Sequence, residues 1–237
     1  MRSPRSRAMF ARFTLALVAV VLPLSAAVSP IAAQAAAEKP AQPLAQRSAN
    51  EGKRPIGWKA RADGGGDMHG GKDTLSFVQM TPGFHVTTGP ASIMWSPDST
   101  ASGEYTVEGS IFLFPTNGRD QEGYGIFIGG KDLEGAAHQY TYFLLRNDGK
   151  YLIKRRTGSQ TSVLKDWTAL PAIKRQSGAD AMKNDLRVAV RAQSVVFSVN
   201  GAEAVTLPRA RVVPEGVFGL RINHAVNSHI VKVSRGK

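Results

Sequence analysis

The sequence contains no cysteine. Its absence excludes disulfide bonds, thiolate zinc sites, cysteine nucleophiles and attachment of lipid through cysteine. A complete phosphate-binding glycine motif and the Gly-x-Ser-x-Gly element of many hydrolases are missing as well. We therefore expect packing to stabilise the fold, and we expect no cofactor.

A hydrophobic run long enough for a membrane span is also lacking. The uncharged run Leu15–Val28 has 14 residues, whereas a spanning helix needs about 20. Four arginines precede this run and small residues follow it, which is the pattern of a signal peptide cleaved after Ala35 or Ala37. We predict a signal peptide over residues 1–37, a bacterial secreted or periplasmic protein, and no transmembrane segment in the mature chain. An uncleaved anchor is the alternative.

Acidic residues are few. The chain has 18 Asp and Glu against 30 Lys and Arg, a formal net charge of +12. Outside the cytoplasm, the polyanions available to a basic surface are acidic polysaccharide, lipopolysaccharide phosphate and anionic membrane, so a glycan or anionic polysaccharide is a candidate partner and no nucleic acid is expected. Net charge alone favours a soluble protein with a high isoelectric point and no polyanionic partner, because charge bears on solubility before it bears on partners.

Sustained helical periodicity is absent, apart from the short polar stretch 178–185. Residues 38–56 carry almost no large apolar side chain, which predicts a flexible linker. From residue 57 to 237, short β-type runs alternate with turn residues, which predicts an all-β antiparallel sandwich. The expected strands begin near Trp58 and continue over 74–80, 84–88, 92–95, 104–114, 124–128, 140–146, 151–157, 186–190, 195–199, 202–207, 217–222 and 230–233.

Two turns have strong hairpin chemistry. Asn200-Gly201 separates two alternating runs, and Asn147-Asp148-Gly149 separates two others. Both favour a tight hairpin because Asn and Gly accept a positive φ. A third turn is expected over Val226–Ser228.

Several of these segments resemble the strands of concanavalin A-like lectin and glucanase jelly rolls. The similarity lies in Asp185–Val190, Val195–Gly201 and Gly216–Arg221, and in the middle hairpin of Tyr140–Leu145 with Gly149–Ile153. The family most similar to these segments is the secreted 3-keto-disaccharide hydrolase-type domain. The resemblance implies a jelly-roll β-sandwich of two curved antiparallel sheets, with sugar bound on the concave one.

The chain departs from this family in its carboxylates. Glucanases of this fold carry Glu-x-Asp-x-x-Glu on one strand, and that triplet is absent here. Asp132 and Glu134 have the spacing of a shared face but lie among glycines, and His138 follows them. Asp132, Glu134 and His138 are the catalytic candidates if the protein is an enzyme. The missing triplet favours a non-catalytic protein.

Metal ligands are not predicted. The glycine-rich loop Asp63–Asp73 contains acids and a histidine, but its spacing matches no calcium loop, and a surface loop is favoured. His224 and His229 are five residues apart and so lie on opposite faces of a strand.

Ligand contacts are expected from aromatic platforms, cationic side chains and planar polar groups. Lys154 and Arg156 share one strand face, as do Arg187 and Arg191, and together they would form one positive surface if their strands were neighbours. Trp167 is the best candidate for an exposed aromatic. The predicted ligand-binding residues are Trp95, Tyr142, Arg146, Lys154, Arg156, Trp167 and Asn223.

The preferred interpretation is a secreted or periplasmic sandwich that binds a glycan or another extracellular ligand without catalysis. A glycoside hydrolase of the 3-keto-disaccharide type is one alternative. An envelope interaction protein that uses a basic face is the other.

Overall fold

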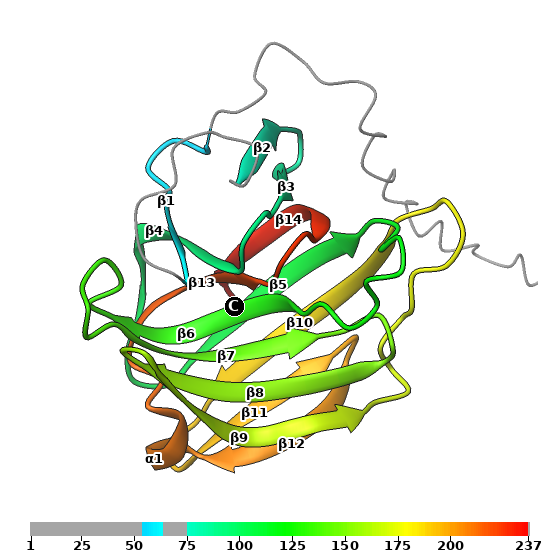
Figure 1. Ribbon diagram of the computed structural model, residues 1–237. Coiled ribbons are helices and arrows are strands. Elements are labelled where there is room, and N and C mark those ends of the chain that lie inside the picture. The colour runs from blue at the N-terminus through cyan, green and yellow to red at the C-terminus, as the bar shows by residue number, and fades with distance from the viewer. Residues whose placement is uncertain (1–53, 64–74, 237) are drawn as a thin grey trace, which may run out of the picture. The chain divides into compact units, whose positions relative to one another are not determined.

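The computed structural model describes residues 54–63 and 75–236. The predicted signal peptide, most of the linker and nearly all of the glycine-rich loop lie outside these residues. The described part is two antiparallel seven-stranded sheets packed face to face, so the predicted all-β sandwich is confirmed (Figure 1). None of the helices formed by the described residues is long and apolar enough to cross a membrane.

The first sheet has the strand order β1-β4-β13-β6-β7-β8-β9. In Figure 1, β6 to β9 lie in front of the strands of the second sheet. Its strands are β1 (Lys59–Ala62), β4 (Ser92–Ala101), β6 (Tyr124–Lys131), β7 (Gln139–Leu145), β8 (Lys150–Thr157), β9 (Gln160–Ala169) and β13 (Gly216–Ile222).

The second sheet has the order β12-β11-β10-β5-β14-β3-β2. A four-residue helix, α1 (Arg209–Val212), follows its edge strand. The strands are β2 (Ser76–Gln79), β3 (Phe84–Thr87), β5 (Tyr105–Leu113), β10 (Met182–Val190), β11 (Ser194–Val199), β12 (Ala202–Pro208) and β14 (Asn227–Arg235).

The main core fills the space between the sheets. Alternate residues of each strand point inward, because successive side chains of a strand face opposite ways. On β6, for example, Tyr124, Ile126 and Ile128 are buried between the sheets. The phenol oxygen of Tyr124 accepts a hydrogen bond there from Nδ2 of Asn184 on β10, at 2.9 Å.

The two predicted hairpin turns are confirmed. Asn200 and Gly201 have φ of 50° and 84°, and they join β11 to β12. Gly149 has φ of 83° between β7 and β8. Asn and Gly are needed at these positions because a β-branched residue would be strained there.

Four expectations on strand extent are wrong. β4 continues through Ser96–Asp98 to Ala101, and β9 over Gln160–Ala169 was not expected at all. β10 starts at Met182, within the short polar stretch 178–185 and before the expected start at Leu186. The turn before β14 lies at residues 224–225, and Asn227 and Ser228 already belong to the strand. In each case pairing with a neighbouring strand decides the boundary, which local turn chemistry does not reveal.

Candidate functional site

The outer face of the first sheet carries a second apolar cluster, separate from the main core. Outward-facing residues of neighbouring strands lie opposite one another, as Phe127 does with Tyr142 and Gly219 with Trp95. The cluster makes this face unusually rich in aromatic and aliphatic side chains for the outside of a sandwich. Its members are Ile93, Trp95, Phe127, Leu133, Tyr140, Tyr142, Leu144 and Leu152, with Trp167 and Val217 packed against it.

A charged cluster lies on the same face. Arg221 of β13 donates to both carboxylate oxygens of Asp63, with Nη2 2.6 Å from Oδ2. Arg156 of β8 adds an ion pair, its Nη1 3.1 Å from Asp63 Oδ1. Arg221 on β13 and Arg156 on β8 thus both bind Asp63, which directly follows β1.

This arrangement fixes the charge of Asp63. Burial alone would raise the pKa of its carboxyl, but the hydrogen bond and charge of Arg221, followed by those of Arg156, lower the pKa below the usual 3.8. The pKa of Arg221 is raised: burial opposes its charge, and the bond to Asp63 outweighs that penalty. Asp63 is therefore a permanent anion at neutral pH, and Arg221, 5% exposed, a permanent buried cation.

Two tyrosines line the cluster. Arg221 lies over the ring of Tyr142 with Cζ 5.5 Å from the centroid, an arrangement that favours the cation. Burial raises the pKa of Tyr142 to about 12 and raises that of Tyr140 as well. Both phenols therefore keep their protons and stay uncharged at neutral pH.

His138 completes this part of the face. Its ring stacks on Tyr140 at 6.1 Å, and its Nδ1 lies 3.1 Å from the carbonyl oxygen of Gly135. Burial lowers the pKa of His138, and the charges of Arg61 and Arg156 lower it further. The imidazole is neutral at pH 7. Since a carbonyl only accepts, Nδ1 carries the proton and Nε2 is left as an acceptor.

Lys154 and Arg61 border the cluster. Lys154 lies directly opposite Tyr142 in the β7–β8 register. Arg61, on β1, donates from Nη1 to the carbonyl oxygens of Leu133 and Gly135, at 3.1 and 2.6 Å. These bonds tie the β6–β7 loop to the face.

The other end of the face carries three more of the predicted residues. Arg146 lies 4.1 Å above the ring of Trp167 and is paired with Asp148, its Nε 3.2 Å from Oδ1. Asn223 follows β13. Its Nδ2 lies next to Gly123, since a Cβ added at Gly123 would lie 3.3 Å from that nitrogen. Trp167 is half-buried and packs against the second apolar cluster, so it is not the exposed platform that was expected.

The structure thus brings most predicted ligand-binding residues to one face of one sheet, but in different roles. Trp95 and Tyr142 are 3% and 7% exposed, so they support the face from beneath. Lys154 is partly exposed at its surface, whereas the side chain of Arg156 is 12% exposed and is paired with Asp63. Lys154 and Arg156 lie on β8 of the first sheet whereas Arg187 lies on β10 of the second, so the strands are not neighbours and the condition for one joint positive surface is not met.

The predicted catalytic candidates lie in and after the β6–β7 loop. Asp132 adopts a φ of 49°, and its Oδ2 accepts from the Ala137 amide at 3.2 Å. Glu134 is exposed and is paired with Lys59. Of the three candidates, His138 is the one that the structure puts beside the charged cluster.

The histidines expected not to bind metal are apart. His224 is an exposed turn residue 3.9 Å from Glu122, whereas His229 is buried on β14 beside His85, with 6.4 Å between ring centroids. Across the described ranges 54–63 and 75–236, no three His, Asp or Glu side chains form a group that could hold a metal ion.

Sequence reasoning missed Arg221 and treated Asp63 only as a loop residue. One signal was present: Arg221 is the charged residue within the otherwise apolar strand β13, Gly216–Ile222. A buried arginine in that position needs a carboxylate partner, but the sequence does not say which. The partner is 158 positions away.

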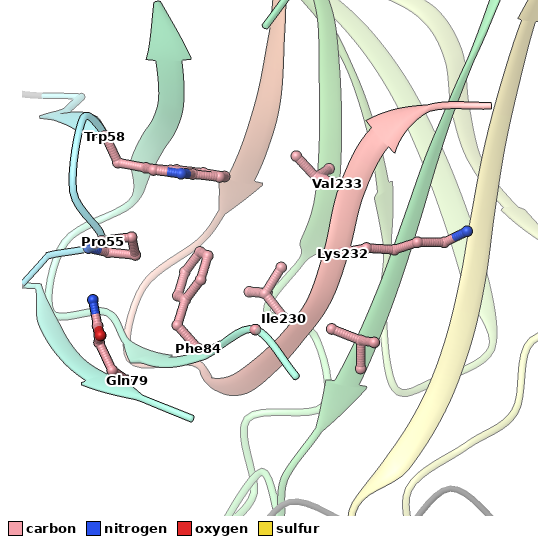
Figure 2. A pocket seen from close by; sticks show the side chains of 9 residues that line it. Pro55, Trp58, Gln79, Phe84, Ile230, Lys232 and Val233 are labelled. Atoms are coloured by element: carbon pink, nitrogen blue, oxygen red, sulfur yellow. The ribbon is translucent and has the colours of Figure 1, made fainter. Parts of the chain in front are cut away.

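A hollow of about 370 Å³ lies elsewhere, beside β14 (Figure 2). Apolar side chains form part of its wall: Trp58 packs edge-on against Phe84, with ring centroids 5.1 Å apart, and Ile230 and Val233 face it. Its polar side chains are Gln79 and Lys232, and the ammonium of Lys232 is already paired with Glu108 at 2.8 Å. The outer face of the first sheet gathers more charged groups, so it is the better candidate site.

No protein-family model matches the sequence, and no curated protein sequence matches it. Solved structures do match. The carbohydrate-binding module CBM66 from Bacillus subtilis aligns with a TM-score of 0.55 at 11% identity, over 76% of this chain and 96% of that one. A Bacteroides ovatus mixed-linkage glucan GH16 protein, in complex with a G4G4G3G product, aligns with a TM-score of 0.52 at 11% identity, over 76% and 94%. The fold is therefore that of the concanavalin A-like lectin and glucanase jelly rolls, as the sequence resemblance implies.

Proposed function

We propose that the outer face of the first sheet binds a glycan and does not cleave it. The observation that carries the proposal is the polar surface built around Asp63, Arg156 and Arg221, with Lys154 beside it, on a firm apolar support. Rigid, planar polar groups of this kind suit the recognition of sugar hydroxyls and acidic groups. The similarity to a carbohydrate-binding module and to a GH16 protein with a glucan product adds support.

The state of Asp63 argues against hydrolysis. Glycoside hydrolysis by paired carboxylates needs a general acid, whose pKa is raised so that it holds a proton near neutral pH. Asp63 is the carboxylate within the charged cluster, and its two arginines lower its pKa. It is suited to accept hydrogen bonds and unsuited to donate a proton.

We also propose that the protein acts outside the cytoplasm, secreted or in the periplasm. This part of the proposal depends on the leader-like residues 1–37. It agrees with a glycan ligand, since structural polysaccharides lie outside the cell.

Affinity electrophoresis tests the proposal. The purified protein is run through gels containing soluble β-glucan, xylan, levan, pectin or alginate, beside Arg156→Gln and the control Arg187→Gln on the second sheet. We expect at least one polysaccharide to retard the protein and Arg187→Gln, and to retard Arg156→Gln much less. Circular dichroism and thermal melts check that both variants are folded.

Three results would contradict the proposal. Migration unaffected by every polysaccharide removes glycan binding. Release of reducing ends from these polymers or from 3-keto-disaccharides supports the hydrolase alternative. Retardation weakened equally by both variants, and lost when salt is added to about the physiological concentration, supports an envelope interaction through general basic charge.

A further inference from the structure

The charged cluster on the outer face of the first sheet, with Lys154 and Arg61 beside it, carries more positive than negative charge. Lys154 is partly exposed, and its ammonium has no hydrogen bond or ion pair to any residue that the structure describes. Arg61 uses only Nη1 in its two bonds to the β6–β7 loop. The Nε of Arg221 also has no hydrogen-bond acceptor among the described residues, but it is buried, so Arg221 adds positive charge beneath the face and no contact with a ligand.

The buried neighbours add no negative charge. Tyr140 and Tyr142, 2% and 7% exposed, stay protonated and neutral because burial raises the pKa of both phenols. The acceptors of this part of the face are Nε2 of His138 and the carboxylate of Asp63. Asp63 already accepts from Arg221 through both of its oxygens and is paired with Arg156.

A neutral sugar does not match such a surface well. Each sugar hydroxyl both donates and accepts, so it gains nothing from a surplus of positive charge. A carboxylate only accepts, carries the complementary charge, and forms stronger, charge-assisted hydrogen bonds with ammonium and guanidinium groups. Lys154 and Arg156 are two residues apart on β8 and project from the same side, about 7 Å apart along the strand.

We propose that the glycan bound here is acidic, and that Lys154, flanked by Arg156, binds the carboxylate of a uronic acid residue. The inference rests on the proposed glycan-binding function and names the class of its ligand. Asp63 and Nε2 of His138 accept hydrogen bonds from hydroxyl groups of the same sugar. The sugar is thereby oriented with its acidic group toward β8.

Matched ligands test this inference. Oligosaccharides of galacturonate, of alginate and of hyaluronan are titrated calorimetrically into the protein at about physiological ionic strength, each beside its carboxyl-reduced form, which keeps the linkage and loses the charge. We expect at least one acidic oligosaccharide to bind, and its reduced form to bind at least about tenfold more weakly, the loss expected for a charge-assisted hydrogen bond.

A matched pair of variants locates the interaction. Lys154→Met keeps the aliphatic stem and removes the ammonium, and because that ammonium has no partner in the described chain, the fold should tolerate the change. We expect about tenfold weaker binding of the acidic oligosaccharide. Arg187→Met, which removes one positive charge from the second sheet, should bind as the parent does.

The outcomes are distinct. Equal binding of acidic and reduced oligosaccharides, with or without an effect of Lys154→Met, overturns the inference and leaves the proposed function standing. Equal losses in Lys154→Met and Arg187→Met, or equally tight binding of dextran sulfate, show unspecific attraction of polyanions and also overturn it. If neither these oligosaccharides nor the neutral polysaccharides bind, the proposed function itself fails.

Discussion

Replacing Asp63 by Asn should destabilise the protein in a pH-dependent way. Arg221 is almost fully buried, and it donates to both carboxylate oxygens of Asp63. Asparagine keeps the shape of the side chain, but it removes the charge and turns one acceptor into a donor that faces a guanidinium. A buried cation is then left without its counter-ion.

The size of the effect follows from the burial of the two partners. Breaking a fully buried ion pair costs about 3–5 kcal/mol, and a hydrogen bond to a charged group contributes about 1.5–3 kcal/mol. Since the side chain of Asp63 is 33% exposed, solvent screens part of the loss. We expect the free energy of unfolding to fall by about 2–3 kcal/mol at pH 7, a drop of about 4–12 °C in Tm for a domain of this size.

The pH dependence has a definite sign. The pKa of Asp63 is lower in the folded state than in the unfolded state, where it is near 3.8. The contribution of the Asp63 charge to stability is therefore complete above the unfolded pKa and is lost as the pH falls through the folded pKa. The asparagine that replaces it does not titrate. The difference in the free energy of unfolding between the parent and Asp63→Asn should therefore be constant from pH 7 to about 5. At lower pH this difference should shrink toward zero.

Urea unfolding followed by tryptophan fluorescence measures this difference, because urea leaves charge interactions unscreened. Asp98→Asn, at an exposed position on β4, is the control and should match the parent. A loss below about 0.5 kcal/mol at pH 7, or a difference that does not narrow below about pH 4, would show that Arg221 does not depend on the charge of Asp63.

Three further predictions concern other parts of the chain. Gly83→Ala should destabilise the protein far more than Gly103→Ala. Both glycines have a positive φ, 82° and 70° respectively. A Cβ at residue 83 would lie 1.8 Å from a backbone carbonyl oxygen of β14, whereas a Cβ at residue 103 would have no atom within 4 Å. Thermal melts should show a loss of about 1 kcal/mol for Gly103→Ala and several for Gly83→Ala, and equal losses would disprove the close approach. An NMR titration of His138 should give a midpoint below 6.5, and a midpoint at or above it would contradict the burial argument. N-terminal sequencing of the exported protein should begin at Ala36 or Glu38, whereas an intact N-terminus would rule out the cleaved leader.

The fold could be predicted where local chemistry and pairing agree. The β11–β12 hairpin is an example, since the Asn200-Gly201 turn and the alternation on both sides point to the same register. β9 was missed because it is an edge strand with few buried residues, so its alternation is too faint to distinguish it from a polar loop. Edge strands bury little, and burial is what makes a strand visible in a sequence.

The candidate site could be predicted only in part. Lys154 and Arg156 share a face because side chains alternate along any strand, a rule that needs no tertiary information. Which sheet that strand joins depends on the tertiary structure, so the sequence left open whether it lies beside the strand that carries Arg187. The pairing of Asp63 with Arg221 requires β1 and β13 to join the same sheet, and no local sequence pattern specifies this.

The tyrosines of the chain distinguish the outer face of the first sheet, which we propose to receive the glycan, from the main core. The chain has five tyrosines, and fluorine NMR of protein labelled with 3-fluorotyrosine observes all of them. Tyr140 and Tyr142 belong to the second apolar cluster on the outer face, whereas Tyr105, Tyr124 and Tyr151 lie in the main core. We expect titration with the polysaccharide that retards the protein most to shift the signals of Tyr140 and Tyr142 and to leave the other three in place. Binding that leaves the signals of Tyr140 and Tyr142 unmoved would contradict this expectation.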